Sequence, residues 1–229
     1  MLIQRAVQSN YTRQPAAGAR RQSPVVSRTL AGPLDMMGAS MPFARNAEIY
    51  GENEPADYVY KIISGTVRTY RILADGRRQI GAFYLPGDVF GLESGNQHSF
   101  SAEAVTDAKV LVIKRSTLHA LAARDHEVAH QLWTITGREL RRVQDHILLL
   151  INTAKERVGA FLLEMAERVS SGNQIELTMS RQDIADYLGL TIETVSRTLT
   201  ELESSATIEL PTSRRVVLRN RAALGLGRA

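Results

Sequence analysis

The 229-residue sequence contains no cysteine. A chain without cysteine has no disulfide bonds, thiolate zinc sites, cysteine-held iron–sulfur clusters or cysteine nucleophiles. It also lacks a long hydrophobic run, because its most apolar segment, residues 147–151, is far shorter than the roughly 18 residues of a membrane span. No apolar core precedes a small-residue cleavage site near the N-terminus, so we expect neither a secretory signal nor a membrane partner.

Acidic residues are missing from one end of the chain. Residues 1–34 contain five arginines and no Asp or Glu, whereas the whole sequence has a net charge of only +4. We interpret residues 1–30, which are rich in Ser, Gln, Ala and Arg, as a flexible basic arm. An Arg-rich leader without acids also resembles an organellar transit peptide, which stays open as an alternative. The net positive charge alone is weak evidence that the protein binds nucleic acid. A prediction of DNA binding must rest on where the charged side chains lie.

The remaining composition, 44% hydrophobic and 23% charged, is that of a folded globular protein. Its first half reads as short strands, because β-rich runs at 58–63, 67–72, 80–85 and 105–113 are separated by turn residues. Asp75-Gly76 is the strongest hairpin signal among these turns. Turns at intervals of about 8–12 residues favour an antiparallel barrel or sandwich over residues 31–115.

A helical stretch is expected over residues 116–152. Within it, apolar residues recur at alternating spacings of three and four, which is a heptad pattern. Such a narrow stripe is typical of a contact between two helices, so we predict homodimerisation here; a helix packed on its own barrel is the alternative. The predicted dimerisation residues are Trp133, Thr136, Leu140, Val143, Ile147 and Leu150.

Two helices with helix–turn–helix spacing follow a further helix at 155–170. Ser180 is a good N-cap for the first, with Asp183 at the capping-box position. Gly189 lies in a tight turn, and Thr191 can cap the second helix, residues 192–204. A short helix, a Gly-containing turn and a second helix form the helix–turn–helix motif that binds DNA.

The outer face of the second helix carries Glu193, Ser196 and Arg197 near its N-terminal end, which is the end that meets base edges. Arginine can contact guanine O6 and N7, and glutamate can accept from cytosine N4, so Glu193, Ser196 and Arg197 are the predicted base contacts. An ordinary exposed ion pair between Glu193 and Arg197 is the alternative.

A basic hairpin closes the sequence. Two strands at 207–210 and 216–219 flank a turn with Arg214 and Arg215, which resembles a wing; a solvated turn is the alternative. Arginines at such a tip suit phosphates. The predicted contacts to the DNA backbone are Ser180, Thr191, Thr194 and Arg215.

A zinc-protease pattern, H-E-x-x-H, occurs at His126, Glu127 and His130. On a helix it would place two imidazoles on one face with a glutamate as base. No third histidine follows at metzincin spacing, and the pattern coincides with the start of the predicted dimerisation helix. We therefore expect solvated histidines, no metal and no catalytic residue, and keep a zinc hydrolase as an alternative. In the sequence, no motif pairs the three other histidines with further residues: His98, His119 and His146.

Residues 187–199, Tyr-Leu-Gly-Leu-Thr-Ile-Glu-Thr-Val-Ser-Arg-Thr-Leu, resemble the recognition motif of the Crp–Fnr superfamily of bacterial transcription regulators. Residues 60–67 and 85–91 resemble the β-roll of that superfamily. The Glu-x-x-Ser-Arg pattern is the Fnr-like variant, which implies half-sites resembling TTGA and TCAA. Within the superfamily the chain is most similar to the FixK-type activators of microoxic respiration and nitrogen fixation. An activator contacts RNA polymerase, so the resemblance implies that partner as well.

Two departures from the superfamily concern its ligands. Fnr itself holds an iron–sulfur cluster with cysteines, and this chain has none. Cyclic-nucleotide-binding members carry Phe-Gly-Glu-Leu and then Arg-Ser, where the arginine holds the cyclic phosphate. Here Phe-Gly-Leu-Glu stands at 90–93, and His98-Ser99 replaces Arg-Ser. A neutral imidazole cannot replace the bidentate guanidinium, so we expect no cyclic-nucleotide effector and no cofactor.

The sequence thus predicts an α+β fold. It comprises an antiparallel β-roll resembling a cyclic-nucleotide-binding domain (31–115), a long dimerisation helix (116–152) and a winged helix–turn–helix domain (153–229). The predicted function is that of a cytoplasmic, homodimeric activator that binds a TTGA-N6-TCAA-like palindrome in double-stranded DNA and is not an enzyme. A ligand-gated regulator of the same superfamily, with an unknown small-molecule effector, stays open as an alternative.

Overall fold

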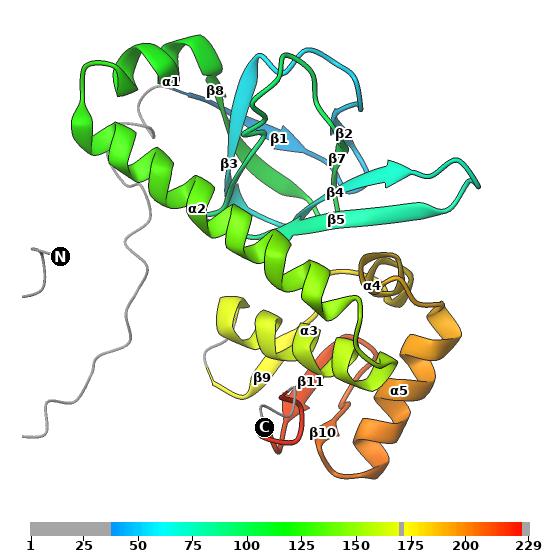
Figure 1. Ribbon diagram of the computed structural model, residues 1–229. Helices are drawn as coiled ribbons and strands as arrows, with labels where there is room; N and C mark the ends of the chain where they lie inside the picture. Colours follow the sequence, from blue (N-terminus) through cyan, green and yellow to red (C-terminus); the bar gives the residue numbers. More distant parts are fainter. Residues whose placement is uncertain (1–37, 170–171, 226–229) are drawn as a thin grey trace, which may run out of the picture.

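The structure is a computed structural model that describes residues 38–169 and 172–225. The predicted architecture is confirmed: an N-terminal antiparallel β domain leads through helices to a C-terminal winged helix–turn–helix (Figure 1). The predicted basic arm, residues 1–30, lies outside the described residues. None of the described helices combines the length and the apolar character needed to cross a membrane.

The N-terminal domain is a roll of two four-stranded antiparallel sheets. One sheet has the order β1-β8-β3-β6 and the other the order β2-β7-β4-β5. Small and β-branched side chains such as Val67, Ala102 and Val110 are fully buried between them. The strands are β1 (Ala39–Phe43), β2 (Glu48–Tyr50), β3 (Tyr58–Ser64), β4 (Val67–Ile72), β5 (Arg78–Tyr84), β6 (Val89–Phe90), β7 (Ser101–Ala104) and β8 (Ala108–Lys114).

Strands β3, β4 and β5 follow the sequence prediction, and Gly76 adopts a left-handed conformation in the β4–β5 hairpin (φ 83°). The run at 105–113 is not one strand, because a turn separates β7 from β8 and Val105 instead donates to the carbonyl of Thr66. Strand β1 was not predicted, since four of its five residues are exposed and leave no hydrophobic pattern.

The stretch expected as one helix over 116–152 is divided in two. Helix α1 (Arg115–Ala122) ends before a short break, and α2 (His126–Leu149) begins after it. Asp125 at the break caps α2, because its carboxylate accepts hydrogen bonds from the backbone N–H groups of Glu127 and Val128. An aspartate in this position satisfies donors that a continuous helix would not expose. The prediction of a single helix was therefore wrong.

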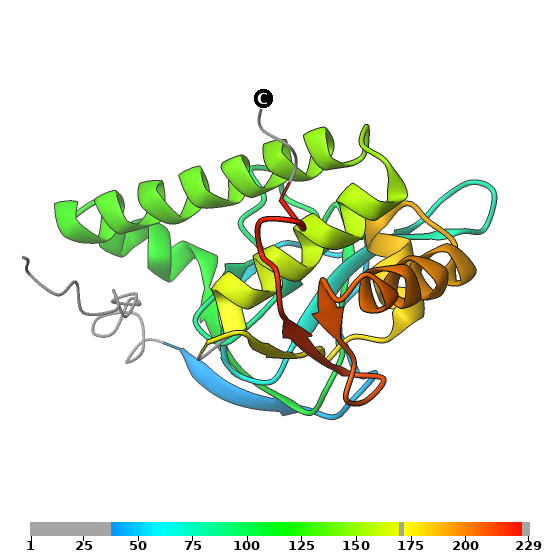
Figure 2. The ribbon, with the colours of Figure 1, turned by 90° about the horizontal axis from the view of Figure 1, so that it is seen from below.

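The C-terminal domain contains α3 (Ala154–Val169), β9 (Gln174–Glu176), α4 (Arg181–Leu188), α5 (Ile192–Ser204), β10 (Ile208–Glu209) and β11 (Arg215–Leu218). Its small sheet has the order β10-β11-β9, so the predicted hairpin gains a third strand. Figures 1 and 2 show α3 lying between α2 and this sheet.

One hydrophobic core joins the two domains. Phe83 and Ile80 of the β-roll belong to the same buried cluster as Phe161 of α3 and Tyr187 of α4. The ring of Phe83 lies 6.3 Å from that of Phe161 and 5.2 Å from that of Tyr187. The helix–turn–helix is therefore packed against the β-roll by apolar contacts rather than attached by a linker alone.

We predict that Phe161→Ala lowers the free energy of unfolding by about 3–5 kcal/mol, because it empties a fully buried aromatic site shared by both domains. Guanidinium unfolding followed by circular dichroism measures this loss. The control is Ile72→Ala, whose side chain is 55% exposed and should matter by no more than about 0.5 kcal/mol. Equal losses in both variants would show that the shared core contributes little.

Candidate nucleic-acid interface

The helix–turn–helix forms from short-range interactions. Ser180 caps α4, and its hydroxyl oxygen accepts from the backbone N–H of Asp183 while the Asp183 carboxylate accepts from the backbone N–H of Ser180. Gly189 ends α4 in a left-handed conformation (φ 62°), which favours glycine. Thr191 then caps α5 by accepting from the backbone N–H of Thr194. The predicted capping box, turn and second cap are all present.

Arg157 of α3 holds the turn between α4 and α5. Its Nη1 donates to the carbonyl of Leu188 at 2.9 Å, and its Nε donates to the carbonyl of Asn152 at 2.9 Å. Carbonyls at the C-terminus of a helix have no partner within that helix, so the guanidinium satisfies acceptors that would otherwise be unpaired. No sequence pattern predicts this role, because the two carbonyls belong to segments on either side of Arg157.

Helix α5 has one buried and one exposed face. Val195, Leu199 and Leu202 are buried against α3 and α4. Glu193 and Arg197 are exposed, and Ser196 between them is half-buried. The structure therefore places the three predicted base contacts on the outward side of the helix, near its N-terminal end.

The side chains of Glu193 and Arg197 are both exposed to solvent. Across residues 38–169 and 172–225, neither side chain forms an ion pair, so the expected alternative of a simple Glu–Arg pair is absent there. The pKa of Glu193 is held below its usual value by its own backbone N–H and by the Thr191 hydroxyl. Glu193 is thus an anion, and hence an acceptor only, at neutral pH.

The four predicted backbone contacts differ in what they can donate. The hydroxyls of Thr191 and Thr194 lie 3.1 Å apart, and the Thr191 hydroxyl also holds the Glu193 carboxylate, so both hydroxyl protons already have acceptors. The hydroxyl proton of Ser180 is already donated to Asp183 at 2.8 Å. Arg215 is exposed and lies 3.5 Å from Glu176 in a weak surface pair. A phosphate could therefore be held by Arg215 more readily than by the three hydroxyls.

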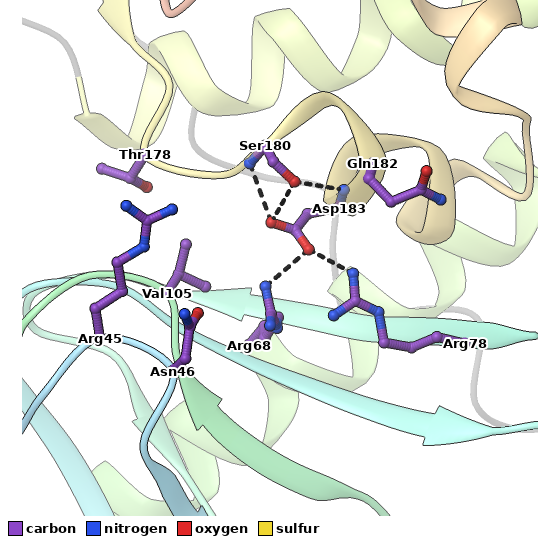
Figure 3. Close-up of a pocket in the computed structure, with 9 residues that line it drawn as sticks. All are labelled: Arg45, Asn46, Arg68, Arg78, Val105, Thr178, Ser180, Gln182 and Asp183. Carbon is purple, nitrogen blue, oxygen red and sulfur yellow. Dashed lines mark hydrogen bonds and ion pairs between the residues drawn. The ribbon is translucent and has the colours of Figure 1, made fainter.

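Asp183 also connects α4 to the β-roll (Figure 3). Its Oδ1 accepts from Nη1 of Arg68 at 2.7 Å and from Nη2 of Arg78 at 2.6 Å. Arg68 further donates to Glu103 at 2.9 Å, and Arg78 to Asp186 at 2.7 Å. Burial opposes the charge of Arg78, but its hydrogen bond to Asp186 and its attraction to both aspartates outweigh that effect and raise its pKa.

Further contacts extend this junction. Thr178 donates to the Thr66 hydroxyl at 3.0 Å, and Arg168 of α3 donates to the carbonyl of Phe83 at 2.8 Å. His146 of α2 stacks on Tyr187 of α4 with ring centroids 4.2 Å apart, and burial lowers its pKa. No sequence pattern pointed to this contact, because Tyr187 is remote from His146 in the sequence.

Aromatic side chains fill the interior of the β-roll. His98 is buried, stacks on Tyr50 at 3.5 Å and forms a hydrogen bond through Nδ1 to Glu93 at 3.0 Å. Tyr60 stacks on Phe90 at 5.1 Å. Burial, reinforced by Glu93, raises the pKa of Tyr60 to about 12. His98, for which the sequence shows no partner pattern, thus belongs to a continuous cluster of aromatic rings inside the β-roll.

The H-E-x-x-H residues do not form a metal centre in the described structure. His126 and His130 are exposed on α2, and the described residues contain no group of three or more side chains arranged to hold a metal. Glu127 instead accepts from Gln131 at 3.0 Å.

An apolar stripe on α2 faces solvent. The exposed fractions of its side chains are 80% for Trp133, 59% for Leu140, 52% for Val143 and 59% for Ile147. Thr136 between them is also exposed. Leu150 differs from the other predicted dimerisation residues, because it lies just after the end of α2 and is half-buried near Gly189.

Comparisons with known proteins agree with this geometry. A family model for a Crp-like helix-turn-helix domain matches residues 156–225, and one for a cyclic nucleotide-binding domain matches residues 40–125. The chain is 54% identical to the nitrogen fixation regulation protein FixK of Azorhizobium caulinodans, with 82% of this chain and 78% of the relative covered. It is 41% identical to the protein of the same name from Rhizobium meliloti, with 88% and 92% covered.

A solved structure, FixK2 from Bradyrhizobium japonicum, has the same fold. It is 50% identical to this chain, the TM-score is 0.81, and the match covers 84% of this chain and 100% of that one.

We predict that Asp183→Ala lowers the free energy of unfolding by about 3–5 kcal/mol, because it leaves two arginine charges without their shared partner. Ser180→Ala, which removes the hydroxyl of the cap but leaves both arginine pairs, should cost only about 1 kcal/mol. Urea unfolding of the two variants separates the effects. A loss in Asp183→Ala no larger than that in Ser180→Ala would contradict the role of the arginine pairs.

Proposed function

This chain belongs to the FixK group of the Crp–Fnr family of transcription regulators, and from that premise we propose that it is a homodimeric activator of a TTGA-N6-TCAA-like palindrome that needs no effector. As a member of this group it is a DNA-binding regulator and not an enzyme. We infer the target sequence, the dimer and the independence from ligands from the arguments that follow.

The exposed side chains of Glu193 and Arg197, which form no ion pair among the described residues, carry the proposal for the target sequence. They lie one turn apart at the N-terminal end of α5, which is the part of a recognition helix that meets base edges. A TTGA half-site has one G·C pair, which offers guanine O6 and N7 to arginine and cytosine N4 to glutamate. Arg197 and Glu193 can therefore read the two sides of one base pair, with Ser196 as a third contact.

Contacts to the DNA backbone would set the register of α5 in the groove. Thr191 and Thr194 sit in its first turn, where the positive end of the helix dipole also favours phosphate. Arg215 begins the last strand of the wing, and Ser180 begins α4. These four positions lie at the starts of α4 and α5 and in the wing, so they could fix the orientation of α5 without contributing to base choice.

The exposed stripe on α2 supports the homodimer. Four large apolar side chains, more than half exposed, lie on one helical face at heptad spacing. A contiguous apolar surface of this kind marks an interaction site in a water-soluble protein. Pairing α2 with its copy would place two α5 helices in successive major grooves, about one helical turn of DNA apart.

The filled β-roll supports effector independence. A cyclic nucleotide needs a cavity and a cation for its phosphate, but His98 stands where the family has arginine and is stacked on Tyr50 and bonded to Glu93. The interdomain contacts of Asp183 also hold the helix–turn–helix in place with no ligand present. Both features favour a regulator that can bind DNA without first binding a ligand.

The names of the relatives suggest the physiological role. FixK proteins regulate nitrogen fixation, and we propose the same class of target genes for this chain. An activator of such genes would act on the chromosome in the cytoplasm and would contact RNA polymerase.

We predict that purified protein binds a TTGA-N6-TCAA duplex more tightly than a scrambled duplex without added ligand, as measured by fluorescence anisotropy over a salt series. Arg197→Ala should lose about 1–3 kcal/mol on the palindrome and tolerate changes at one base pair. Arg215→Ala should instead weaken binding to all duplexes similarly. Selective binding only after a small molecule is added would favour the ligand-gated alternative, and wild-type affinity in Arg197→Ala would refute the assignment of the base contacts.

We predict that Leu140→Glu converts the dimer to a monomer at micromolar concentration, because it places a charge in the centre of the apolar stripe. Sedimentation velocity measures the change. The control variant is Arg141→Glu, which introduces the same side chain at the next position of α2, outside the stripe. This variant should remain dimeric. A dimer in both variants would show that α2 is not the dimer interface.

A further inference from the structure

Two histidines extend the apolar stripe of α2 toward its N-terminus. His126 lies seven residues before Trp133, so it repeats the heptad position of Trp133 and Leu140. His130 lies four residues after His126, one turn further along the same face. Both imidazoles are exposed, and within the described part of the chain neither forms a hydrogen bond or an ion pair. The stripe therefore ends in two side chains that can bind a metal and have no other partner there.

The first turn of α2 is anchored to the β-roll, which fixes the direction of these histidines. Val128 is 1% exposed and packs in a buried cluster with Leu118 of α1, and Asp125 caps the turn. At about 100° per residue, positions 126 and 130 each lie about 160° around the helix from Val128. His126 and His130 therefore project from the side opposite the β-roll, into the surface by which we propose that two copies pair.

The two α2 helices of the proposed dimer run parallel. Helix α2 has 24 residues and so spans about 36 Å. Figure 1 shows α4 and α5 at its C-terminal end and α1 beside its start. An antiparallel pair would hold its two α5 helices farther apart than the roughly 34 Å between successive turns of one groove. A parallel pair keeps both α5 helices at one end, as the proposed palindrome requires.

A parallel pair brings the histidines of both copies together. In a two-fold symmetric pair of helices, a residue at the first core position of the heptad faces its own copy. His126 occupies that position, and His130 of each helix lies one turn further along beside it. Ala129 occupies the core position between them, and its small side chain leaves room for imidazole rings and an ion. Four imidazoles thus converge at the start of the two helices.

These four imidazoles match the coordination of a divalent transition metal. Imidazole nitrogen is a preferred ligand of Zn²⁺, Ni²⁺ and Cu²⁺, and structural zinc sites take four protein ligands. Among the described residues of one chain, no group of three or more His, Cys, Asp or Glu side chains is arranged for a metal, so a second copy is needed to complete the set. The carboxylates of Asp125 and Glu127 flank His126 in the sequence and add negative charge that favours a cation.

We propose that one divalent transition-metal ion, Zn²⁺ or an ion with the same preference for imidazole, binds between the two α2 helices of the dimer, with His126 and His130 of both copies as its ligands. Protein ligands fill all four positions, so the ion is structural and holds together the ends of the helices remote from DNA. A metal that binds only the dimer also tightens the dimer. This inference rests on the proposed dimer and adds an ion to it.

Sedimentation equilibrium of the parent protein in Zn²⁺ and in EDTA tests the effect on the dimer. We expect the dissociation constant of the dimer to fall by about tenfold or more in saturating Zn²⁺, and calorimetric titration to give one ion for two chains. His126→Ala and His130→Ala should each lose most of this effect. His119→Ala, which removes an exposed histidine of α1, is the matched control and should behave like the parent.

Trp133 gives an independent readout, because it is the only tryptophan of the chain and lies three residues from His130 on the same helix. Ni²⁺, which quenches nearby indole fluorescence, should quench Trp133 in the parent at lower concentrations than in Leu140→Glu, the variant designed to be monomeric. Equal Ni²⁺ affinities in these two proteins would mean that each helix binds metal by itself, and would overturn the shared site. A dimer whose dissociation constant does not respond to Zn²⁺ would overturn it as well.

Failure of the proposed function gives different results. A parent protein that is monomeric in both EDTA and Zn²⁺ would refute the proposed dimer, and the shared site with it. A dimer that responds to Zn²⁺ but does not discriminate the palindrome from a scrambled duplex would refute the target sequence and support the metal site. A dimer that binds the palindrome selectively in EDTA and ignores Zn²⁺ would refute the metal site alone.

Discussion

The orientation of the DNA-binding helices depends on one buried carboxylate. Asp183 uses one oxygen to close the capping box with Ser180, and the other to accept from Arg68 and Arg78. The same side chain therefore starts α4 and attaches it to two strands of the β-roll. Because charge-assisted hydrogen bonds of this kind are directional, they fix the angle of α4 as well as its distance from the sheet.

The aromatic contacts of the junction supplement this polar link. Phe83, Phe161 and Tyr187 come from a strand, from the helix after α2 and from α4, and they pack in one cluster. A domain that shares a core with its neighbour does not rotate freely about a linker. The arrangement of the two domains is therefore stabilised by contacts from within the chain.

The local parts of the structure could be predicted from the sequence, and the junction could not. Ser180, Gly189 and Thr191 specify the helix–turn–helix through contacts with residues no more than five positions away, so short motifs reveal them. Arg68 and Asp183 are 115 residues apart, and no periodicity connects them. The break before α2 was missed because one aspartate outweighs a pattern that suits a longer helix. The sequence predicted that the site residues on α5 share one face of the helix. Only the structure shows that Glu193 and Arg197 form no ion pair among the described residues.

The link from Arg157 to Asn152 and Leu188 has a consequence for the operators that such a dimer accepts. It joins the segment after α2 to the turn before α5, so the separation of two α5 helices follows from the pairing of two α2 helices. Inserting one base pair between half-sites moves them apart by about 3.4 Å and turns one relative to the other by about 35°. A dimer braced in this way cannot follow that change by bending, so among its targets the length of the proposed six-base spacer would vary less than the base sequence of that spacer.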